Sequence, residues 1–181
     1  DLAFELIRQG KENACTDLGL QATGDPFMDK RLADFVKEGK KVGYEYVYIN
    51  TNGALASPKK AKPVVDAGCD SIKFSINANN KEDFKTIHGY DDFQKVLDNL
   101  KWIYEYRNKH KIKMGVYVSS VKSSKSNITQ NIENLIKPHC DNFDFRHVSN
   151  QGGSMMELNE TESIKKGNIL GSLKKEEFTT R

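Results

Sequence analysis

The fold of this 181-residue chain is decided by residues 45–77, EYVYINTNGALASPKKAKPVVDAGCDSIKFSIN. Residues 45–51 and 71–77 are rich in aromatic and β-branched side chains, which is typical of strands. Between them, Ser57 followed by Pro58 is a favourable start for a helix. A strand, a helix and a second strand in this order predict a parallel pair joined by a right-handed crossover.

The same alternation extends in both directions from this unit. Toward the N-terminus, the pattern predicts a helix over 2–9 that Gly10 ends, a strand over 16–22 and a helix from 29 to about 41. Toward the C-terminus, it predicts an irregular stretch to about Tyr90, a helix over 92–109, a strand over 113–120, a helix between Asn127 and Pro138, and a strand over 142–148. Five strands separated by helices indicate a parallel α/β sheet.

Apolar and polar side chains alternate along these strands. In the strand over 71–77, one face carries Ile72, Phe74 and Ile76, and the other carries lysine, serine and asparagine. A doubly wound sheet buries both faces of its central strands, which then read as apolar throughout. The one-sided pattern therefore favours a barrel-like curved sheet with outer helices and a functional cavity inside.

Composition excludes several classes of protein. The 28 Lys+Arg and 25 Asp+Glu residues give a net charge of +3 without a concentrated basic patch, so no nucleic-acid partner is expected. No apolar run approaches the roughly 20 residues of a membrane helix. The three cysteines are far apart and odd in number, which favours free thiols in the cytoplasm. Residues 154–181 are polar and charged, and are expected to form a linker or tail.

Small polar residues and glycine gather where the predicted strands end. Sites in α/β sheets form at the carboxyl ends of strands, and short side chains allow a polar small molecule to approach the backbone closely. The candidate residues at these ends are Gly24, Asp25, Pro26, Asn50, Thr51, Ser75, Asn77, Asn150 and Gly152. They suit a ligand that resembles a nucleotide or an amino acid.

The order of these motifs resembles the radical S-adenosylmethionine (radical SAM) enzymes. The motifs are Thr-Gly-Asp-Pro, then Asn-Thr-Asn-Gly-Ala-Leu, then Ala-Gly-Cys-Asp-Ser-Ile-Lys-Phe-Ser-Ile-Asn. The resemblance covers residues 1–153 and is strongest to members with a C-terminal SPASM extension. It implies a partial TIM-like (β/α)6 barrel whose first strand is missing, followed by a linker over 154–181 toward a further domain.

The resemblance also implies roles for the candidate residues. Gly24, Asp25 and Pro26 match the motif that cradles the amino group of S-adenosylmethionine, although the family usually has glutamate at Asp25. Asn50 and Thr51 match positions near the methionine or ribose part. Residues implied for the carboxylate, ribose and adenine of the cofactor are Ser75, Asn77, His88, Asn150 and Gly152. His88 lies near the place of an arginine in related enzymes, and only its protonated form supplies charge.

The mechanism that the resemblance implies is reductive cleavage of S-adenosylmethionine by a [4Fe-4S] cluster. An external electron donor reduces the cluster. The 5′-deoxyadenosyl radical then attacks a small-molecule or peptide substrate, here expected to be peptide or sugar-like. The family's C-x-x-x-C-x-x-C loop is absent from this sequence. The chain is therefore expected to be the middle of a longer enzyme, inactive by itself.

Three further residues, Lys73, Tyr117 and Arg146, are candidates for binding substrate on the inner face of the sheet. Lys73 is the most informative, because an inward-pointing ammonium group in the middle of a strand needs a partner. Two alternatives stay open. The chain could be a non-catalytic α/β nucleotide-binding domain, or a barrel enzyme that uses Lys73 in Schiff-base chemistry.

Overall fold

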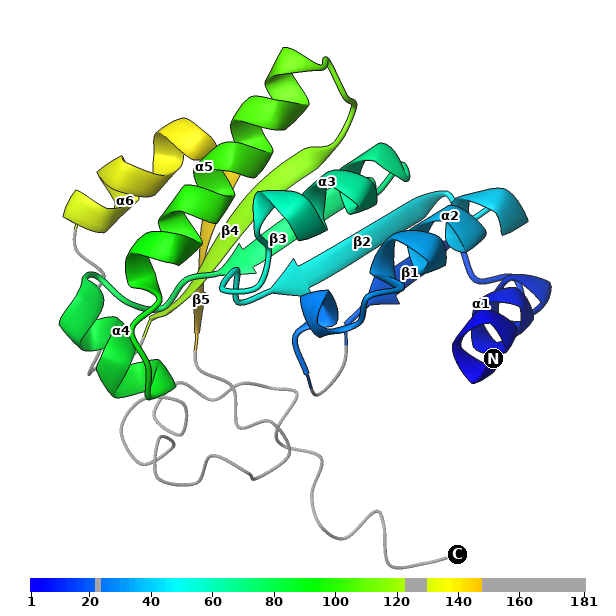
Figure 1. Cartoon of the computed structure of the whole chain (residues 1–181), viewed down its shortest axis with the longest axis horizontal. Coiled ribbons are helices and arrows are strands. Elements are labelled where there is room, and N and C mark those ends of the chain that lie inside the picture. The colour runs from blue at the N-terminus through cyan, green and yellow to red at the C-terminus, as the bar shows by residue number, and fades with distance from the viewer. Residues whose placement is uncertain (22–23, 123–129, 148–181) are drawn as a thin grey trace, which may run out of the picture.

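The computed structural model describes residues 1–21, 24–122 and 130–147 (Figure 1). It contains one five-stranded parallel sheet in the order β1-β2-β3-β4-β5. The strands are β1 (Asp17–Leu20), β2 (Tyr46–Thr51), β3 (Ser71–Ser75), β4 (Gly115–Lys122) and β5 (Asn142–His147). The helices are α1 (Leu2–Glu12), α2 (Leu32–Val42), α3 (Pro58–Asp66), α4 (Lys81–His88), α5 (Phe93–Lys109) and α6 (Gln130–Ile136), with short 3-10 turns at Pro26–Met28 and Lys137–His139.

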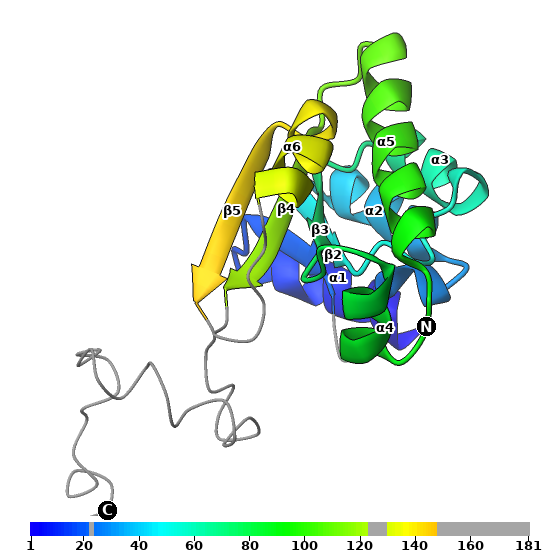
Figure 2. The ribbon, with the colours of Figure 1, turned by 90° about the vertical axis from the view of Figure 1, so that its left-hand side faces the viewer.

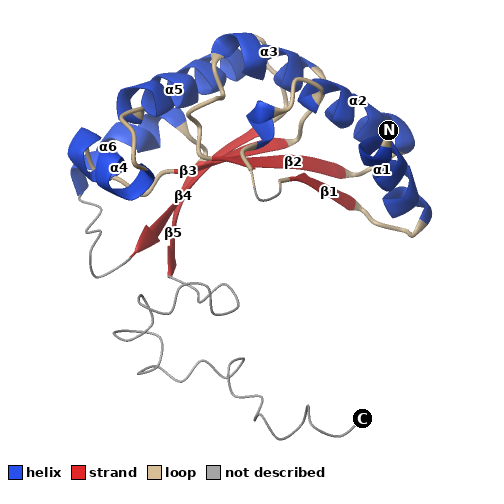
Figure 3. Cartoon of the chain, turned by 60° about the horizontal axis from the view of Figure 1, so that its bottom comes forward, coloured by secondary structure: helices blue, strands red, loops and turns tan. Residues whose placement is uncertain are grey.

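The sheet is curved and open, and the helices lie along one of its faces (Figure 3). Because each strand pairs only with its neighbours in sequence, β1 and β5 form the two edges of the described sheet. Figure 2 views the molecule from the side of β5 and α6. This arrangement confirms the prediction of a parallel curved sheet with outer helices. The face turned away from the helices is called the inner face below.

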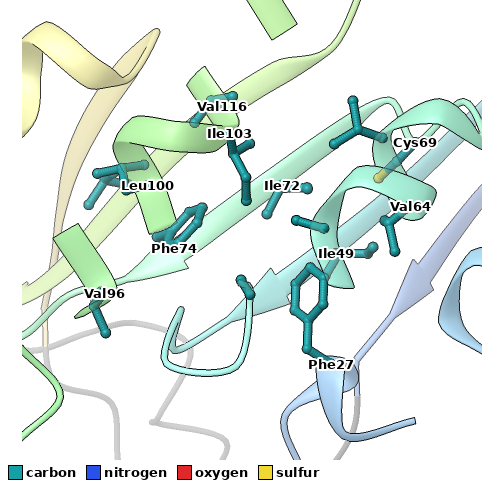
Figure 4. Packing of buried hydrophobic residues seen from close by; sticks show 14 of the residues in the cluster. Phe27, Ile49, Val64, Cys69, Ile72, Phe74, Val96, Leu100, Ile103 and Val116 are labelled. Atoms are coloured by element: carbon teal, nitrogen blue, oxygen red, sulfur yellow. The ribbon is translucent and has the colours of Figure 1, made fainter. Parts of the chain in front are cut away.

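The core lies between the sheet and the helices (Figure 4). Ile49, Ile72 and Phe74 are fully buried there, together with Leu100 and Ile103 from α5. Their neighbours Tyr48, Asn50, Lys73 and Ser75 are only partly buried on the inner face, so the alternation predicted from the sequence is confirmed. Burial of such side chains contributes about 1.5–3 kcal/mol each, which makes this layer the main source of stability.

Two predicted boundaries were wrong. The stretch predicted to be irregular up to Tyr90 contains α4, which begins where the Asn80 side chain accepts a hydrogen bond from the backbone N–H of Asp83 at 2.8 Å. Helix α1 continues through Gly10 to Glu12. At Gly10 a Cβ atom would collide with the hydroxyl of Tyr44, so glycine is present for close packing and does not end the helix.

Two aspartates fasten the edge at which the strands begin, called the amino edge below. The Asp70 carboxylate accepts hydrogen bonds from the backbone N–H of Val47 and from Lys40, both at 2.7 Å. Asp141 repeats this arrangement, accepting from Val116 N–H at 2.7 Å and from Arg107. Each aspartate also donates its own backbone N–H to the carbonyl of the same valine. These paired contacts hold the loop before a strand against the start of the preceding strand.

Candidate functional site

The carboxyl edge of the sheet, where the strands end, brings the loop after β1 against the end of β2. The Asp25 carboxylate accepts a hydrogen bond from the Thr51 hydroxyl at 2.6 Å and from the backbone N–H of Asn52 at 3.0 Å. Its other oxygen accepts from the backbone N–H of Phe27 at 3.0 Å, which begins the 3-10 turn at Pro26–Met28. The Asp25 side chain therefore joins the Gly24-Asp25-Pro26 loop to β2.

The turn after β2 is held from both sides. Thr51 is buried, and its hydroxyl accepts the backbone N–H of Gly53 at 2.9 Å. Gly53 has a φ of +82°, and a Cβ atom there would lie 2.6 Å from the ring of Phe74, so this position requires glycine. Asn99 of α5 donates its side-chain amide to the Gly53 carbonyl at 2.8 Å. The buried Thr51 thus supports the turn from the core side, whereas the side chain of the neighbouring Asn50 lies on the inner face of the sheet.

Ser75 and Asn77 lie next to each other at the end of β3, as the alternation predicts. The Asn77 amide nitrogen lies 3.5 Å from the Ser75 hydroxyl oxygen. The Asn77 side-chain oxygen accepts the backbone N–H of Val121 in β4 at 2.9 Å. Both side chains are partly buried, so they offer short polar groups at the edge while Asn77 also joins β3 to β4.

Lys73 occupies the centre of the inner face. In the register of the sheet it lies beside Asn50 of β2 and Tyr117 of β4. Its side chain is partly buried, and no hydrogen bond or ion pair joins its ammonium group to a residue within the described ranges. Asn50 donates its amide to Gln21, so it already has a partner on the side of β1.

Tyrosines cover the inner face toward the amino edge. Tyr48 lies over Gly19, where a Cβ atom would lie 2.6 Å from its hydroxyl oxygen, and Tyr117 lies over Gly115 in the same way at 2.5 Å. The Tyr46 hydroxyl donates to the Ser71 hydroxyl at 2.7 Å. Burial, followed by the charge of Tyr46, raises the pKa of Tyr117. We call Tyr46, Tyr48 and Tyr117 the tyrosine floor.

His88 lies at the end of α4 in an aromatic group. Its ring centroid is 4.3 Å from that of Phe84 and 6.2 Å from that of Tyr90. Burial lowers the pKa of His88, and its Nε2 atom is buried without a hydrogen-bond partner among the described residues. A neutral ring is thereby favoured, and this works against the charged form that the expected contact with a carboxylate requires.

The remaining predicted residues are less informative. Arg146 lies on β5, beside Val121 in the register, and its side chain is exposed. Asn150 and Gly152 lie outside the residues that the structure describes, as does Asn127, the predicted start of α6. The predicted tail over 154–181 also lies outside them.

The cysteines do not form a ligand set for an iron–sulfur cluster. Cys15 is exposed, whereas Cys69 and Cys140 are buried in separate loops. Burial raises the pKa of Cys69 to about 12 and that of Cys140 to about 11, which disfavours the thiolate that binds iron. Over residues 1–21, 24–122 and 130–147, no group of three or more His, Cys, Asp or Glu side chains is placed to hold a metal ion. The described residues therefore do not fit a cluster.

Sequence reasoning missed two polar residues that build this edge, Gln21 and Asn99. Gln21 accepts the amide of Asn50, and Asn99 is 4% exposed while holding the Gly53 carbonyl. Asn99 carries a detectable signal, because it lies beside Leu100 on the apolar stripe of a helix, where a polar residue needs a partner. Gln21 carries none, since a polar residue at the end of an edge strand is common.

Comparison with known proteins gives a consistent family. The sequence model of the radical SAM superfamily matches residues 1–118, well over half of the chain. A probable GTP 3′,8-cyclase from Saccharolobus solfataricus is 36% identical over 78 residues, which cover 43% of this chain and 25% of that protein. A second probable GTP 3′,8-cyclase, from Sulfurisphaera tokodaii, is 33% identical over 78 residues, with the same coverage of both chains. The chain spans about a quarter of the length of these curated relatives.

A solved structure shows the same fold at low sequence identity. It is a domain of a pyruvate-formate lyase-activating enzyme from Bacteroides vulgatus, with a TM-score of 0.58 and 12% identity. The match covers 71% of this chain and 78% of that chain. Within the described residues, none of the helices is long and apolar enough to cross a membrane.

Proposed function

The chain belongs to the radical SAM superfamily, and from that premise we propose that its sheet forms the S-adenosylmethionine cradle of a radical SAM enzyme. The observation that carries this proposal is the junction at Asp25, which joins the loop after β1 to Thr51 and Asn52 at the end of β2. A cradle that must hold a polar cofactor by many weak contacts gains affinity from loops held in place before binding.

The proposed contacts divide between backbone and side chains. Because the Asp25 carboxylate is occupied by three internal hydrogen bonds, the loop of Gly24, Asp25 and Pro26 would receive the amino group of the cofactor through its backbone carbonyls. Ser75 and Asn77 would hold the carboxylate and ribose with their hydroxyl and amide groups. Asn50 would contact the methionine or ribose part, with Thr51 as its support from beneath.

The other residues predicted to contact the cofactor are His88, Asn150 and Gly152. His88 would meet the carboxylate only when protonated, and burial opposes that state. Asn150 and Gly152 stay predicted contacts of the adenine, since they lie outside the described residues. The inner-face residues Lys73, Tyr117 and Arg146 would face the substrate.

For the whole enzyme we propose the family's reaction, in which an iron–sulfur cluster and an external electron donor cleave S-adenosylmethionine reductively. The described residues supply no ligands to that cluster, so this part of the chain binds and orients the cofactor. The relatives named as GTP 3′,8-cyclases do not support the peptide or sugar-like substrate expected from the sequence, and favour a nucleotide. A SPASM-type extension stays a prediction.

Binding of S-adenosylmethionine by the full-length protein tests the cradle. Asn77→Ala removes the amide group that would contact the cofactor, and with it the oxygen that accepts the N–H of Val121. Together with Ser75→Ala, it is expected to weaken binding about tenfold in calorimetry, since each lost hydrogen bond contributes about 0.5–1.5 kcal/mol. Thr86→Ala, which removes an exposed hydroxyl on α4, is the matched control.

Equal affinity in the double variant and the control would contradict the assignment of Ser75 and Asn77. Catalysis is tested separately, by anaerobic cluster reconstitution of the full-length protein and chromatography for 5′-deoxyadenosine. Absence of this product with a loaded cluster and reductant, despite binding of S-adenosylmethionine, would contradict the enzyme and favour a binding domain.

A further inference from the structure

Among the described side chains, Lys73 is the only charged one on the inner face of the three central strands, β2, β3 and β4. Within β2, β3 and the described side chains of β4, the other inner-face residues are all neutral: Tyr46, Tyr48, Asn50, Ser71, Ser75, Gly115, Tyr117, Ser119 and Val121. The acidic residues of the described inner face, Asp17 and Asp144, lie on the edge strands β1 and β5. Asp144 already accepts the amide of Asn142 at 2.8 Å.

A partly buried ammonium group without a carboxylate partner costs free energy of desolvation. The hydrogen-bonded aspartates of this chain show the usual solution, since Asp70 is paired with Lys40 and Asp141 with Arg107. Lys73 departs from this pattern among the described residues. An external anion bound on the inner face of the sheet, next to Lys73, would supply the missing negative charge.

Small side chains lie next to Lys73 on the side of the carboxyl edge. Tyr48 lies over Gly19 of β1, and Tyr117 lies over Gly115 of its own strand. Tyr117 therefore lies toward the amino edge rather than over its register neighbour Lys73. In the next inner-face row toward the carboxyl edge, the register places the small side chains of Ser75 and Ser119, of which Ser119 is buried.

We propose that Lys73 is an anchor for an anionic group, phosphate or carboxylate, on the substrate of this enzyme. This inference rests on the proposed function, because it places the substrate on the inner face and the cofactor at the carboxyl edge. The ammonium group offers three donors, which suits a phosphate or a carboxylate. Asn50 and Tyr117 lie on either side of Lys73 in the register and carry no charge that would compete for the anion. The proposal excludes a substrate without an acidic group.

Calorimetry on the full-length protein with S-adenosylmethionine present tests this anchor. The probes are inorganic phosphate, pyrophosphate and malonate, so that a phosphate and a carboxylate preference are distinguished by which probe binds best. Lys73→Met is expected to weaken binding of the best probe about tenfold or more, and Lys73→Arg to retain most of it, since a charged hydrogen bond contributes about 1.5–3 kcal/mol. Lys101→Met, on the exposed surface of α5, is the matched control.

The same samples are titrated with S-adenosylmethionine alone, which is expected to bind each variant like the original protein. Equal probe binding by Lys73→Met and Lys101→Met, or no probe binding by the original protein, would overturn the anchor. A loss of S-adenosylmethionine binding in Lys73→Met would also overturn it, by assigning the ammonium group to the cofactor. Lys73→Gln replaces Lys73→Met if circular dichroism shows that the latter is unfolded. Failure of the original protein to bind S-adenosylmethionine would instead contradict the proposed function.

Discussion

Aspartate residues stabilise both edges of the sheet, but their hydrogen-bond partners differ. At the amino edge, Asp70 and Asp141 each join a backbone N–H and a cation from a helix, Lys40 or Arg107. At the carboxyl edge, Asp25 has no cation within the described residues and bonds only to neutral donors. The amino edge is neutralised internally, whereas the carboxyl edge keeps uncompensated polar groups that an external ligand can use.

The largest expected effect comes from breaking a pair at the amino edge. Arg107 is 8% exposed, and Arg107→Met leaves the Asp141 carboxylate without its cation. We expect a loss of about 3 kcal/mol in the free energy of unfolding, measured by urea denaturation. Lys37→Met removes the exposed pair with Asp34 and is expected to cost less than about 1 kcal/mol. Similar losses for both would show that the amino edge is not a special source of stability.

A smaller loss of stability, but a larger loss of binding, is expected at the carboxyl edge. Asp25→Ala removes the cap of the 3-10 turn and the contacts to Thr51 and Asn52, at about 2 kcal/mol of stability. Because the loop is then no longer held against β2, binding of S-adenosylmethionine should fall together with it. Denaturation and calorimetry on the same sample separate the two. Unchanged binding would place the cradle elsewhere.

Removal of a neutral hydrogen bond at the amino edge is expected to have a smaller effect on stability. The Tyr44 hydroxyl donates to the Ile7 carbonyl at 2.9 Å and joins α1 to the loop before β2. Tyr44→Phe is expected to cost about 1 kcal/mol, read as a shift in the midpoint of urea unfolding. Binding of S-adenosylmethionine should stay unchanged, since the contact lies at the opposite edge from the cradle. A change in binding would contradict the idea that the amino edge acts on stability alone and the carboxyl edge on cofactor binding.

The smallest expected effect is the pH dependence contributed by His88 near the carboxyl edge. Burial lowers its pKa below the ordinary value of 6.5, so between these two pKa values the unfolded chain binds more protons than the folded chain. Stability should therefore fall as the pH falls through 6.5, and level off below the lowered pKa. His88→Gln should flatten this part of the stability profile between pH 5 and 7. An unchanged profile would show that another group titrates there.

The sheet and its two faces were predictable because they depend on local pattern. Ile72 and Phe74 alternate with Lys73 and Ser75, and a period of two residues specifies which side chains share a face. Helix α4 was missed because its apolar content is low, and its asparagine cap also reads as a turn. The role of Gly10 was mistaken for a helix end because the reason for a glycine there, the Tyr44 hydroxyl, lies 34 residues away in the chain.

The sequence by itself determined the order of the five strands, the face of the sheet on which their side chains lie, and the motifs that match the radical SAM superfamily. Tertiary structure alone decided which polar groups are occupied. Asp25 and Thr51 are 26 residues apart, and their hydrogen bond turns a predicted ligand-binding acid into a support for the loop. Such pairings depend on the distance between side chains after folding, which strand register sets and sequence spacing does not reveal. The same register places Lys73 between the neutral side chains of Asn50 and Tyr117, which is the basis of the proposed anion anchor.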